Sequence, residues 1–264
     1  MSGRIRASVI LACFMVFTLP LMPVQAVFLR MHTPLARWFP HWYHRRACRI
    51  LGVRCTIDGV ILRDRPVLVI SNHASWLDIP VLSAMAPVSF VAKKEISRWP
   101  FVATLAKLQR TVFVDRERRT TVGDTANEIL GRLASGDAIV LFAEGTSSDG
   151  NRVLPFKTSL FAAAKPSEPD GTAANTSNTV VQTVSIVYLR RNGLPLGWAG
   201  RRAFGYFGDV DIGPNAWSIL TGGPIDAVIK IGPPVPLDAF KDRKDLARRA
   251  EEAVRSGFLE VLLG

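Results

Sequence analysis

Short apolar runs alternate along the chain with segments in which apolar residues recur at helical spacing. The apolar runs are rich in β-branched and aromatic residues, which predicts buried strands at 66–71, 88–92, 111–114, 138–143, 180–188 and 227–231. Helical spacing predicts helices at 76–85, 120–135 and 237–263, the last amphipathic with a basic face. The stretch 165–179, rich in Pro, Ser, Asn and Thr, predicts a surface loop or lid. Together they predict one α/β domain with a mixed central sheet flanked by helices.

The amino-terminal part follows a different pattern, because no residue between Arg6 and Arg30 is charged. The run 7–29 is about 35 Å long as a helix, which is enough to cross a bilayer. One interpretation is a cleaved signal peptide, with Arg4 and Arg6 as its basic region and an end near Ala26.

Two further interpretations keep this segment in the protein. One is a spanning helix that Pro20 and Pro23 kink, and the other is a helix up to about Leu19 that enters one leaflet and turns back at these prolines. Arginines and aromatic residues, which suit the headgroup layer of an anionic membrane, crowd the downstream flank: Arg30, Arg37, Trp38, Phe39, Trp42, Tyr43, Arg45, Arg46 and Arg49. We therefore predict an uncleaved membrane anchor and basic interfacial segment over 1–55, followed by a globular domain over 56–264.

Charge and cysteine content narrow the class of protein. The chain of 264 residues has 33 Lys and Arg against 22 Asp and Glu, a net charge of +11, which implies an acidic partner such as nucleic acid, anionic lipid or an acidic carrier protein. Its cysteines, Cys13, Cys48 and Cys55, form no Cys-x-x-Cys pair, so neither a disulfide framework nor a structural zinc site is expected. Reduced thiols fit a cytoplasmic domain.

The candidate chemistry lies where the strand 66–71 runs into Asn72-His73-Ala-Ser75-Trp-Leu-Asp78. A histidine between a strand and a helix lies at a sheet edge, where α/β proteins place reactive groups. Asp78, in the first helical turn, can reach back to the imidazole, fix its tautomer and stabilise its charged form, so that His73 acts as a general base. The alternative is structural, because Ser75 and Asp78 by themselves have the spacing of a helix capping box.

The chain offers this base no protein nucleophile. No Gly-x-Ser-x-Gly elbow, phosphate-binding loop or dinucleotide fingerprint occurs, and no cysteine has a base beside it in the sequence. The nucleophile is then expected to be a hydroxyl of the substrate. Two other segments are candidates for binding a ligand. Segment 112–116 ends a strand at Arg116, whose charge can bind an anion, and in segment 141–146 Gly145 lets the backbone approach a ligand.

Together these three segments resemble the lysophosphatidate acyltransferase family of glycerolipid acyltransferases. Residues 72–78 match its NHxSxxD block, 112–116 its second block, and Glu144-Gly145-Thr146 the core of its third. The resemblance implies transfer of a fatty acyl group from a thioester to a lipid hydroxyl, with 56–264 as the acyltransferase domain. It also implies roles for individual residues: His73 as base and Asp78 as its orienting acid, with Asn72, Ser75, Arg116, Glu144, Gly145, Thr146 and Lys157 as substrate-binding residues.

Departures from the family pattern bear on the acceptor. Ala143 and Ser147 replace the proline and arginine that usually flank Glu-Gly-Thr, Ser185 stands at the proline of the fourth block, and Gln109-Arg110 stand where a glycine often precedes the second. Loss of an arginine at 147 removes a phosphate contact worth about 1.5–3 kcal/mol.

One branch of the family shares the altered third block. Residues 144–157 and 206–211 resemble the bacterial lyso-ornithine lipid acyltransferases, whose acceptor carries a carboxylate and an amine but no phosphate; acids such as Asp149 or Asp209 are available for the amine. Lysophosphatidate stays open as the alternative or an additional acceptor. The expected donor is acyl-[acyl carrier protein] or acyl-CoA, with no metal or redox cofactor, at the cytoplasmic face of a bacterial inner membrane.

Two other classes of function fit less well. A basic nucleic-acid binder would need interleaved aromatics on a basic groove, and the apolar amino terminus argues against it. A membrane-anchored thioesterase shares the thioester chemistry with water as acceptor; release of free fatty acid without a lipid product would distinguish it.

Overall fold

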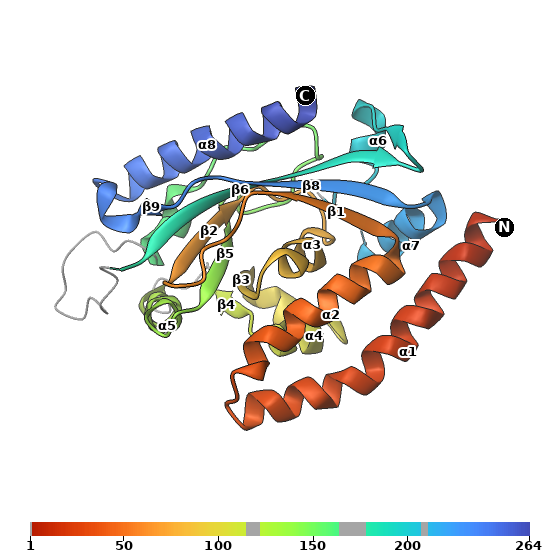
Figure 1. The fold of residues 1–264 in the computed structure, drawn as a ribbon, viewed down its shortest axis with the longest axis horizontal. Coiled ribbons are helices and arrows are strands. Elements are labelled where there is room, and N and C mark those ends of the chain that lie inside the picture. Colours follow the sequence, from red (N-terminus) through yellow and green to blue (C-terminus); the bar gives the residue numbers. More distant parts are fainter. Residues whose placement is uncertain (1, 115–121, 164–177, 207–210) are drawn as a thin grey trace.

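The computed structural model describes residues 2–114, 122–163, 178–206 and 211–264. Figure 1 shows a central twisted sheet with helices on both faces. The strands are β1 (Val53–Asp58), β2 (Val67–Ser71), β3 (Val88–Lys93), β4 (Val112–Val114), β5 (Ala138–Phe142), β6 (Val180–Arg191), β7 (Leu194–Pro195), β8 (Ile225–Ile231) and β9 (Val235–Pro236). The α-helices are α1 (Gly3–Arg30), α2 (Leu35–Leu51), α3 (Asp78–Met85), α4 (Val102–Leu108), α5 (Val122–Ala134), α6 (Trp198–Arg202), α7 (Ile212–Gly222) and α8 (Arg243–Leu263). Short 3₁₀ helices lie at η1 (Lys94–Arg98), η3 (Thr158–Ala163) and η4 (Leu237–Ala239).

The sheet is mixed, as the sequence predicts. Its order is β1-β8-β6-β2-β5-β3-β4, with β7 and β9 paired to β6. The strands β6, β2, β5, β3 and β4 run parallel, whereas β8 is antiparallel to β6 and parallel to β1. All five residues of β2 are buried, which is why this central strand reads as an uninterrupted apolar run.

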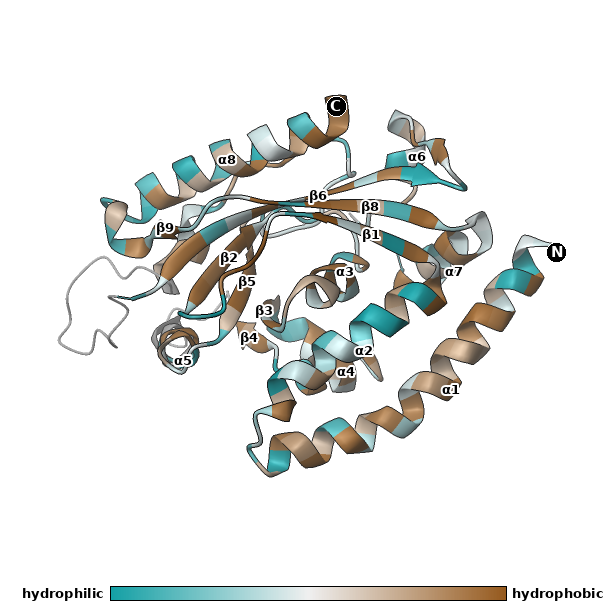
Figure 2. Ribbon diagram, in the orientation of Figure 1, coloured by the Kyte–Doolittle hydropathy of each residue, from teal (hydrophilic) through white to brown (hydrophobic). Residues whose placement is uncertain are grey.

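Two hydrophobic clusters, one on each face, make the molecule three-layered. On one face α8 packs on β6 and β8, and the cluster there includes Leu246, Val254 and Phe258. On the other face α1, α2, α3 and α7 surround a cluster that includes Leu82 and Ile219. Figure 2 shows the resulting colours: β2 and β5 are mostly brown, whereas α8 alternates between teal and brown.

The predicted boundaries of most elements agree with the structure to within about two residues, but the tail differs. The helix expected from residue 237 begins at Arg243, because Leu237–Ala239 forms a 3₁₀ turn and Asp242 caps α8 by accepting hydrogen bonds from the Lys244 and Asp245 amides. Of the expected loop 165–179, residues 165–177 lie outside the described part of the chain. The division of the chain at residues 55 and 56 stays a prediction.

The amino-terminal segment is one continuous helix, so of the three interpretations the one in which the chain turns back at Pro20–Pro23 is wrong. A proline inside a helix removes one hydrogen bond and kinks it without having to end it, and Figure 1 shows α1 bending partway along. The chain reverses instead between Met31 and Pro34, where His32 has φ 50°, and returns as α2.

Helix α1 is apolar enough to cross a membrane yet is attached to the domain along its length. Its mean hydropathy reaches 2.2 over a window of which only 11% is buried. Arg6 Nη1 donates to the Leu220 carbonyl of α7 (2.8 Å), and Thr18 Oγ1 contacts the Tyr43 hydroxyl of α2 (2.7 Å). Near the far end, Gln25 Nε2 donates to the carbonyls of Ala36 (3.0 Å) and Leu108 (2.9 Å). The bonds therefore hold α1 against α7, α2 and α4.

Candidate active site

The predicted site residues lie at the carboxyl edge of the parallel strands. His73 follows β2 by two residues, and Glu144 follows β5, the neighbour of β2. Since adjacent parallel strands end at the same edge of a sheet, the first and third sequence blocks meet there. Arg116, of the second block, lies outside the described residues, as does Asp209.

His73 and Asp78 form a close pair. His73 Nδ1 is 2.8 Å from Asp78 Oδ2; the histidine side chain is 20% exposed and the aspartate fully buried. The same Oδ2 accepts the backbone N–H groups of Ala74 (2.7 Å) and Ser75 (2.9 Å). Asp78 thus bonds the two amides that precede α3 while it also orients the imidazole. The full capping box does not form, because α3 begins at Asp78 and its N-cap, Leu77, makes no side-chain cap bond.

The backbone and ring of His73 are held from three directions. Its N–H donates to Glu144 Oε1 (3.0 Å), and its carbonyl accepts the N–H of Ser148 (2.7 Å). The imidazole stacks on the ring of Phe142, with centroids 4.0 Å apart and planes at 21°. With Nδ1 bonded to Asp78, Nε2 is the nitrogen left to meet a substrate.

The other polar residues of the first block face the protein's own backbone. The Asn72 side chain is buried, donates to the Ile186 carbonyl (3.0 Å) and accepts the Ile186 N–H (2.8 Å), which ties the segment to β6. Ser75 is also buried, and its Oγ accepts the Leu77 N–H (3.4 Å). These contacts position His73; the expected contact of Asn72 and Ser75 with substrate stays a prediction.

The third block places a buried acid beside the histidine. Glu144 is only 1% exposed, and burial raises its pKa to about 8, against the opposing effect of the His73 and Leu154 amides. Gly145 adopts φ 72°, a conformation that favours glycine, and Thr146 is exposed. Lys157 is exposed too, and its N–H donates to the Ala143 carbonyl (2.8 Å), which closes the loop.

Sequence reasoning missed three contributors to this site. Tyr188, from β6, donates its hydroxyl hydrogen to Asp78 Oδ1 (2.6 Å) although the two residues are 110 positions apart. Phe142 and Ser148 lie inside segments that the sequence did single out, but nothing in the sequence shows that they contact His73. Tyr188 had no distinctive signal, because the predicted strand 180–188 also contains Gln182, Thr183 and Ser185.

Two departures from the family pattern have a structural explanation. Ser185 Oγ donates to the Val254 carbonyl (2.8 Å), so the residue in place of the proline fastens α8 to β6. Arg110 adopts φ 63°, the left-handed conformation that a glycine would tolerate, and its guanidinium pairs with buried Asp137.

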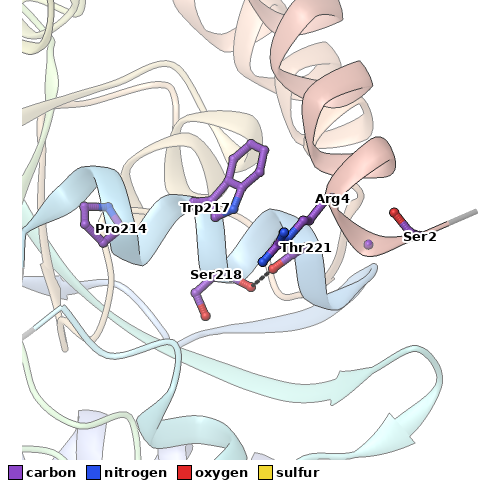
Figure 3. A pocket seen from close by; sticks show the side chains of 7 residues that line it. Ser2, Arg4, Pro214, Trp217, Ser218 and Thr221 are labelled. Atoms are coloured by element: carbon purple, nitrogen blue, oxygen red, sulfur yellow. Dashed lines mark hydrogen bonds between the residues drawn. The ribbon is translucent and has the colours of Figure 1, made fainter.

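A surface hollow of about 550 Å³ lies elsewhere, between the start of α1 and α7. Figure 3 shows Arg4, Trp217 and Thr221 around it. Neither His73 nor Asp78 lines this hollow, so the described chemistry lies outside it.

Comparison with known proteins identifies the class. Residues 52–187 match the model of the Acyltransferase family, and the chain belongs to that family. It is 44% identical over 264 residues, 100% of this chain and 98% of the other, to the lyso-ornithine lipid O-acyltransferase of Brucella abortus (strain 2308). Identity to the lyso-ornithine lipid O-acyltransferase of Rhizobium meliloti (strain 1021) is 40%, over 94% of this chain and 84% of that one.

The fold matches a solved relative as well. The crystal structure of the 1-acyl-sn-glycerophosphate acyltransferase from Thermotoga maritima superposes with a TM-score of 0.58 at 25% identity, covering 84% of this chain and 78% of that one. The expected family and α/β fold are therefore confirmed, and the protein is an acyltransferase of lipid biosynthesis whose apolar first helix is consistent with membrane association.

Proposed function

We propose that the protein is a lyso-ornithine lipid O-acyltransferase, which transfers a fatty acyl group from a thioester to the hydroxyl of lyso-ornithine lipid and so makes ornithine lipid. The observation that carries this proposal is the 44% identity, over the whole chain, to a relative of that name. The reaction takes place at the cytoplasmic face of a bacterial inner membrane.

The mechanism follows from the geometry around His73. Asp78 accepts the Nδ1–H, so Nε2 is free to take the proton as the acceptor hydroxyl attacks the thioester carbonyl. A carbon–oxygen bond forms, the carbon–sulfur bond breaks, and the imidazolium returns the proton to the leaving thiolate. Asp78 stabilises the imidazolium in between.

The oxyanion of the tetrahedral intermediate needs nearby N–H donors. The amides of His73, Ala74 and Ser75 already donate to Glu144 and Asp78. In the turn 144–147 the Gly145 N–H also has a partner, the Phe142 carbonyl (3.2 Å), so the amides of Thr146 and Ser147 are the proposed oxyanion donors.

Charge in the third-block loop supports an acceptor with an amine. Ser147 supplies no positive charge for a phosphate, and Asp149 follows Ser148, whose N–H bonds the His73 carbonyl. Asp149 is half-buried, its Oδ1 accepts the Asn151 N–H (3.1 Å), and within the described residues it pairs with no cation. Its carboxylate can therefore bind the ornithine amine.

The acceptor is tested by a membrane assay with labelled acyl-[acyl carrier protein] and each lyso-lipid in turn. We expect labelled ornithine lipid as the main product. Labelled phosphatidic acid as the only diacyl product would establish the alternative acceptor, lysophosphatidate, which the name of the Thermotoga maritima relative favours.

The Asp149→Asn variant sharpens this test, because asparagine keeps the side-chain oxygen that accepts the Asn151 N–H and removes only the charge. We expect kcat/KM for lyso-ornithine lipid to fall about tenfold or more, the effect of one charged hydrogen bond, while the rate with lysophosphatidate does not fall. Equal losses on both acceptors, or none, would contradict a role for Asp149 in binding the amine. The Asp149→Ala variant also breaks the turn, so the difference between its loss and that of Asp149→Asn measures the structural contribution.

The donor proposal rests on the basic surface of α2. Arg45, Arg46 and Arg49 are exposed, and the Arg46 guanidinium lies over the Trp42 ring, 4.5 Å from its centroid. Such a surface attracts an acidic carrier protein, whose many carboxylates can face several arginines at once. In the assay run with both donors, we therefore expect faster acyl transfer from acyl-[acyl carrier protein] at low salt. We expect this preference to decline as salt is added.

A further inference from the structure

Strand β6 holds both ends of the segment that carries His73. Asn72, at the start of the segment, is bonded to the backbone of Ile186, and Asp78, at its end, is bonded to the hydroxyl of Tyr188 two residues further along the strand. We propose that Tyr188 is a positioning residue that fixes the Asp78 carboxylate and thereby tunes the basicity of His73. The proposal rests on the base mechanism above, but not on which lipid is the acceptor.

The two oxygens of Asp78 have separate partners. Oδ2 accepts His73 Nδ1 and the amides of Ala74 and Ser75, whereas Oδ1 accepts the Tyr188 hydroxyl at 2.6 Å. Asp78 is fully buried, so loss of the Tyr188 hydroxyl leaves Oδ1 as an unsatisfied charged acceptor in the core. The tyrosine therefore prevents the carboxylate from rotating away from the imidazole.

The Tyr188 hydroxyl stays protonated and can therefore always donate a hydrogen bond. It is 2% exposed, and burial together with the charge of Asp78 raises its pKa well above the ordinary value, so it keeps its proton at every working pH. Its ring stacks on Phe204, with centroids 5.7 Å apart and planes at 11°. This packing is independent of the hydroxyl.

Other titratable groups lie near Tyr188 and Asp78 and contribute to the pH dependence of activity. Glu144, after β5, faces Asp78, and Cys48 of α2 and Cys55 of β1 face Tyr188. All three stay in place when the Tyr188 hydroxyl is removed. A shift seen on that change therefore reports the bond to Asp78.

The Tyr188→Phe variant tests the proposal, because phenylalanine keeps the ring stack and removes only the hydroxyl. A carboxylate with one donor fewer presents more negative charge to the imidazole and stabilises its protonated form. We expect kcat/KM at neutral pH to fall about tenfold, the scale of one hydrogen bond to a charged group, with the loss in kcat rather than in either KM. The acid limb of the pH–rate profile shifts to higher pH, because the base now has to lose its proton at a higher pKa.

A matched control is Tyr43→Phe, which removes a phenolic hydroxyl bonded to Thr18 (2.7 Å), outside the bonds around His73. Its pH–rate profile keeps the wild-type position. Combining Tyr188→Phe with Asp78→Asn tests the route of the effect: the two losses are less than additive if Tyr188 acts through the carboxylate.

A second variant covers the case in which Tyr188→Phe folds poorly. 3-Fluorotyrosine placed at position 188 is a stronger donor of nearly the same size, and it shifts the acid limb to lower pH. Opposite shifts in the two variants support the proposal. A Tyr188→Phe protein with lower unfolding temperature and an unmoved pH profile, or losses that add fully with Asp78→Asn, would overturn it. If wild-type protein acylates only lysophosphatidate, the proposed acceptor fails and the same tests of Tyr188 proceed on that lipid.

Discussion

At the scale of single residues, buried polar groups around His73 do most of the positioning. Asp78 is fully buried and accepts four hydrogen bonds, from His73, Ala74, Ser75 and Tyr188. Glu144 is nearly as buried and holds the His73 amide. The two acids differ in their surroundings: Asp78 has a donor on each oxygen, whereas burial dominates at Glu144 and raises its pKa to about 8.

The raised pKa of Glu144 predicts how the stability of the folded protein depends on pH. Its pKa rises from 4.5 in the unfolded chain to about 8 in the folded protein, so across this window the unfolded chain releases a proton that the folded protein keeps. The folded state therefore loses stability relative to the unfolded state as pH rises from about 4.5 to about 8. The Glu144→Gln variant does not titrate, and we expect its unfolding free energy to gain on that of the wild type by an amount on the order of a few kcal/mol over this range. Denaturant unfolding at several pH values checks this, and curves that stay parallel would contradict it.

At the scale of elements, the active segment is fixed by strands that come from distant parts of the sequence. β2 delivers His73, β5 delivers Glu144, and β6 holds both ends of the segment 72–78. Helix α8 supports β6 from the other face through the bond of Ser185 to Val254. Around this bond α8 and β6 lie so close together that a Cβ added at Gly257 would be 2.7 Å from Ser185 Oγ.

Gly257→Ala tests this approach between α8 and β6. Alanine in a helix interior normally adds about 0.5–1 kcal/mol of stability over glycine. Here the new methyl displaces Ser185 Oγ and breaks a buried hydrogen bond, which costs about 1–3 kcal/mol, so we expect a net loss in unfolding free energy. The Ser185→Ala/Gly257→Ala pair loses less than the sum of the single variants. A Gly257→Ala protein more stable than the wild type would show that the two elements do not depend on this contact.

The pattern of the sequence predicted the elements whose burial is simple. β2 and β5 are apolar throughout, and α5 has a regular apolar stripe, so they were predicted with nearly correct bounds. For α2 the sequence indicates only an interfacial stretch, because its arginines and aromatic residues obscure the helical pattern of an element that packs on α3. α7 contains Gly and Pro and gave no helical signal.

In the candidate site, contacts between residues close in the sequence could be predicted, whereas contacts between distant residues could not. The pair of His73 and Asp78 is local and could be predicted from spacing. The bonds of Asn72 to Ile186 and of Tyr188 to Asp78 join positions more than a hundred residues apart, and no single sequence carries that information.

At the scale of the whole molecule, the N-terminal helix is part of the folded protein and is also apolar enough to associate with a membrane. Arg6, Thr18 and Gln25 bond it to α7, α2 and α4, while Val9, Val16 and Val27 on its outer side stay exposed. Leaving the domain to cross a bilayer would break these bonds at both ends and in the middle of the helix. We therefore propose that α1 lies in one leaflet, parallel to the surface, with its outer side in lipid.

Labelling at position 2 tests this arrangement. In a Ser2→Cys variant made in a Cys13→Ser background, we expect a membrane-impermeant maleimide to reach position 2 from the side that carries the catalytic domain, in sealed vesicles of known orientation. The Cys13→Ser chain alone is the blank, since Cys55 is partly exposed. Labelling that requires permeabilisation of the vesicle would show that α1 spans the bilayer.

The central claim is that His73, oriented by Asp78, activates a lipid hydroxyl, and the His73→Ala variant tests it most directly. Its acyl transfer is to be measured in vesicles alongside its unfolding temperature. The account predicts a loss of kcat of about 10² to 10⁴-fold, the usual contribution of a positioned base, in a protein that remains folded. Acyl transfer near the wild-type rate by the folded variant would contradict it.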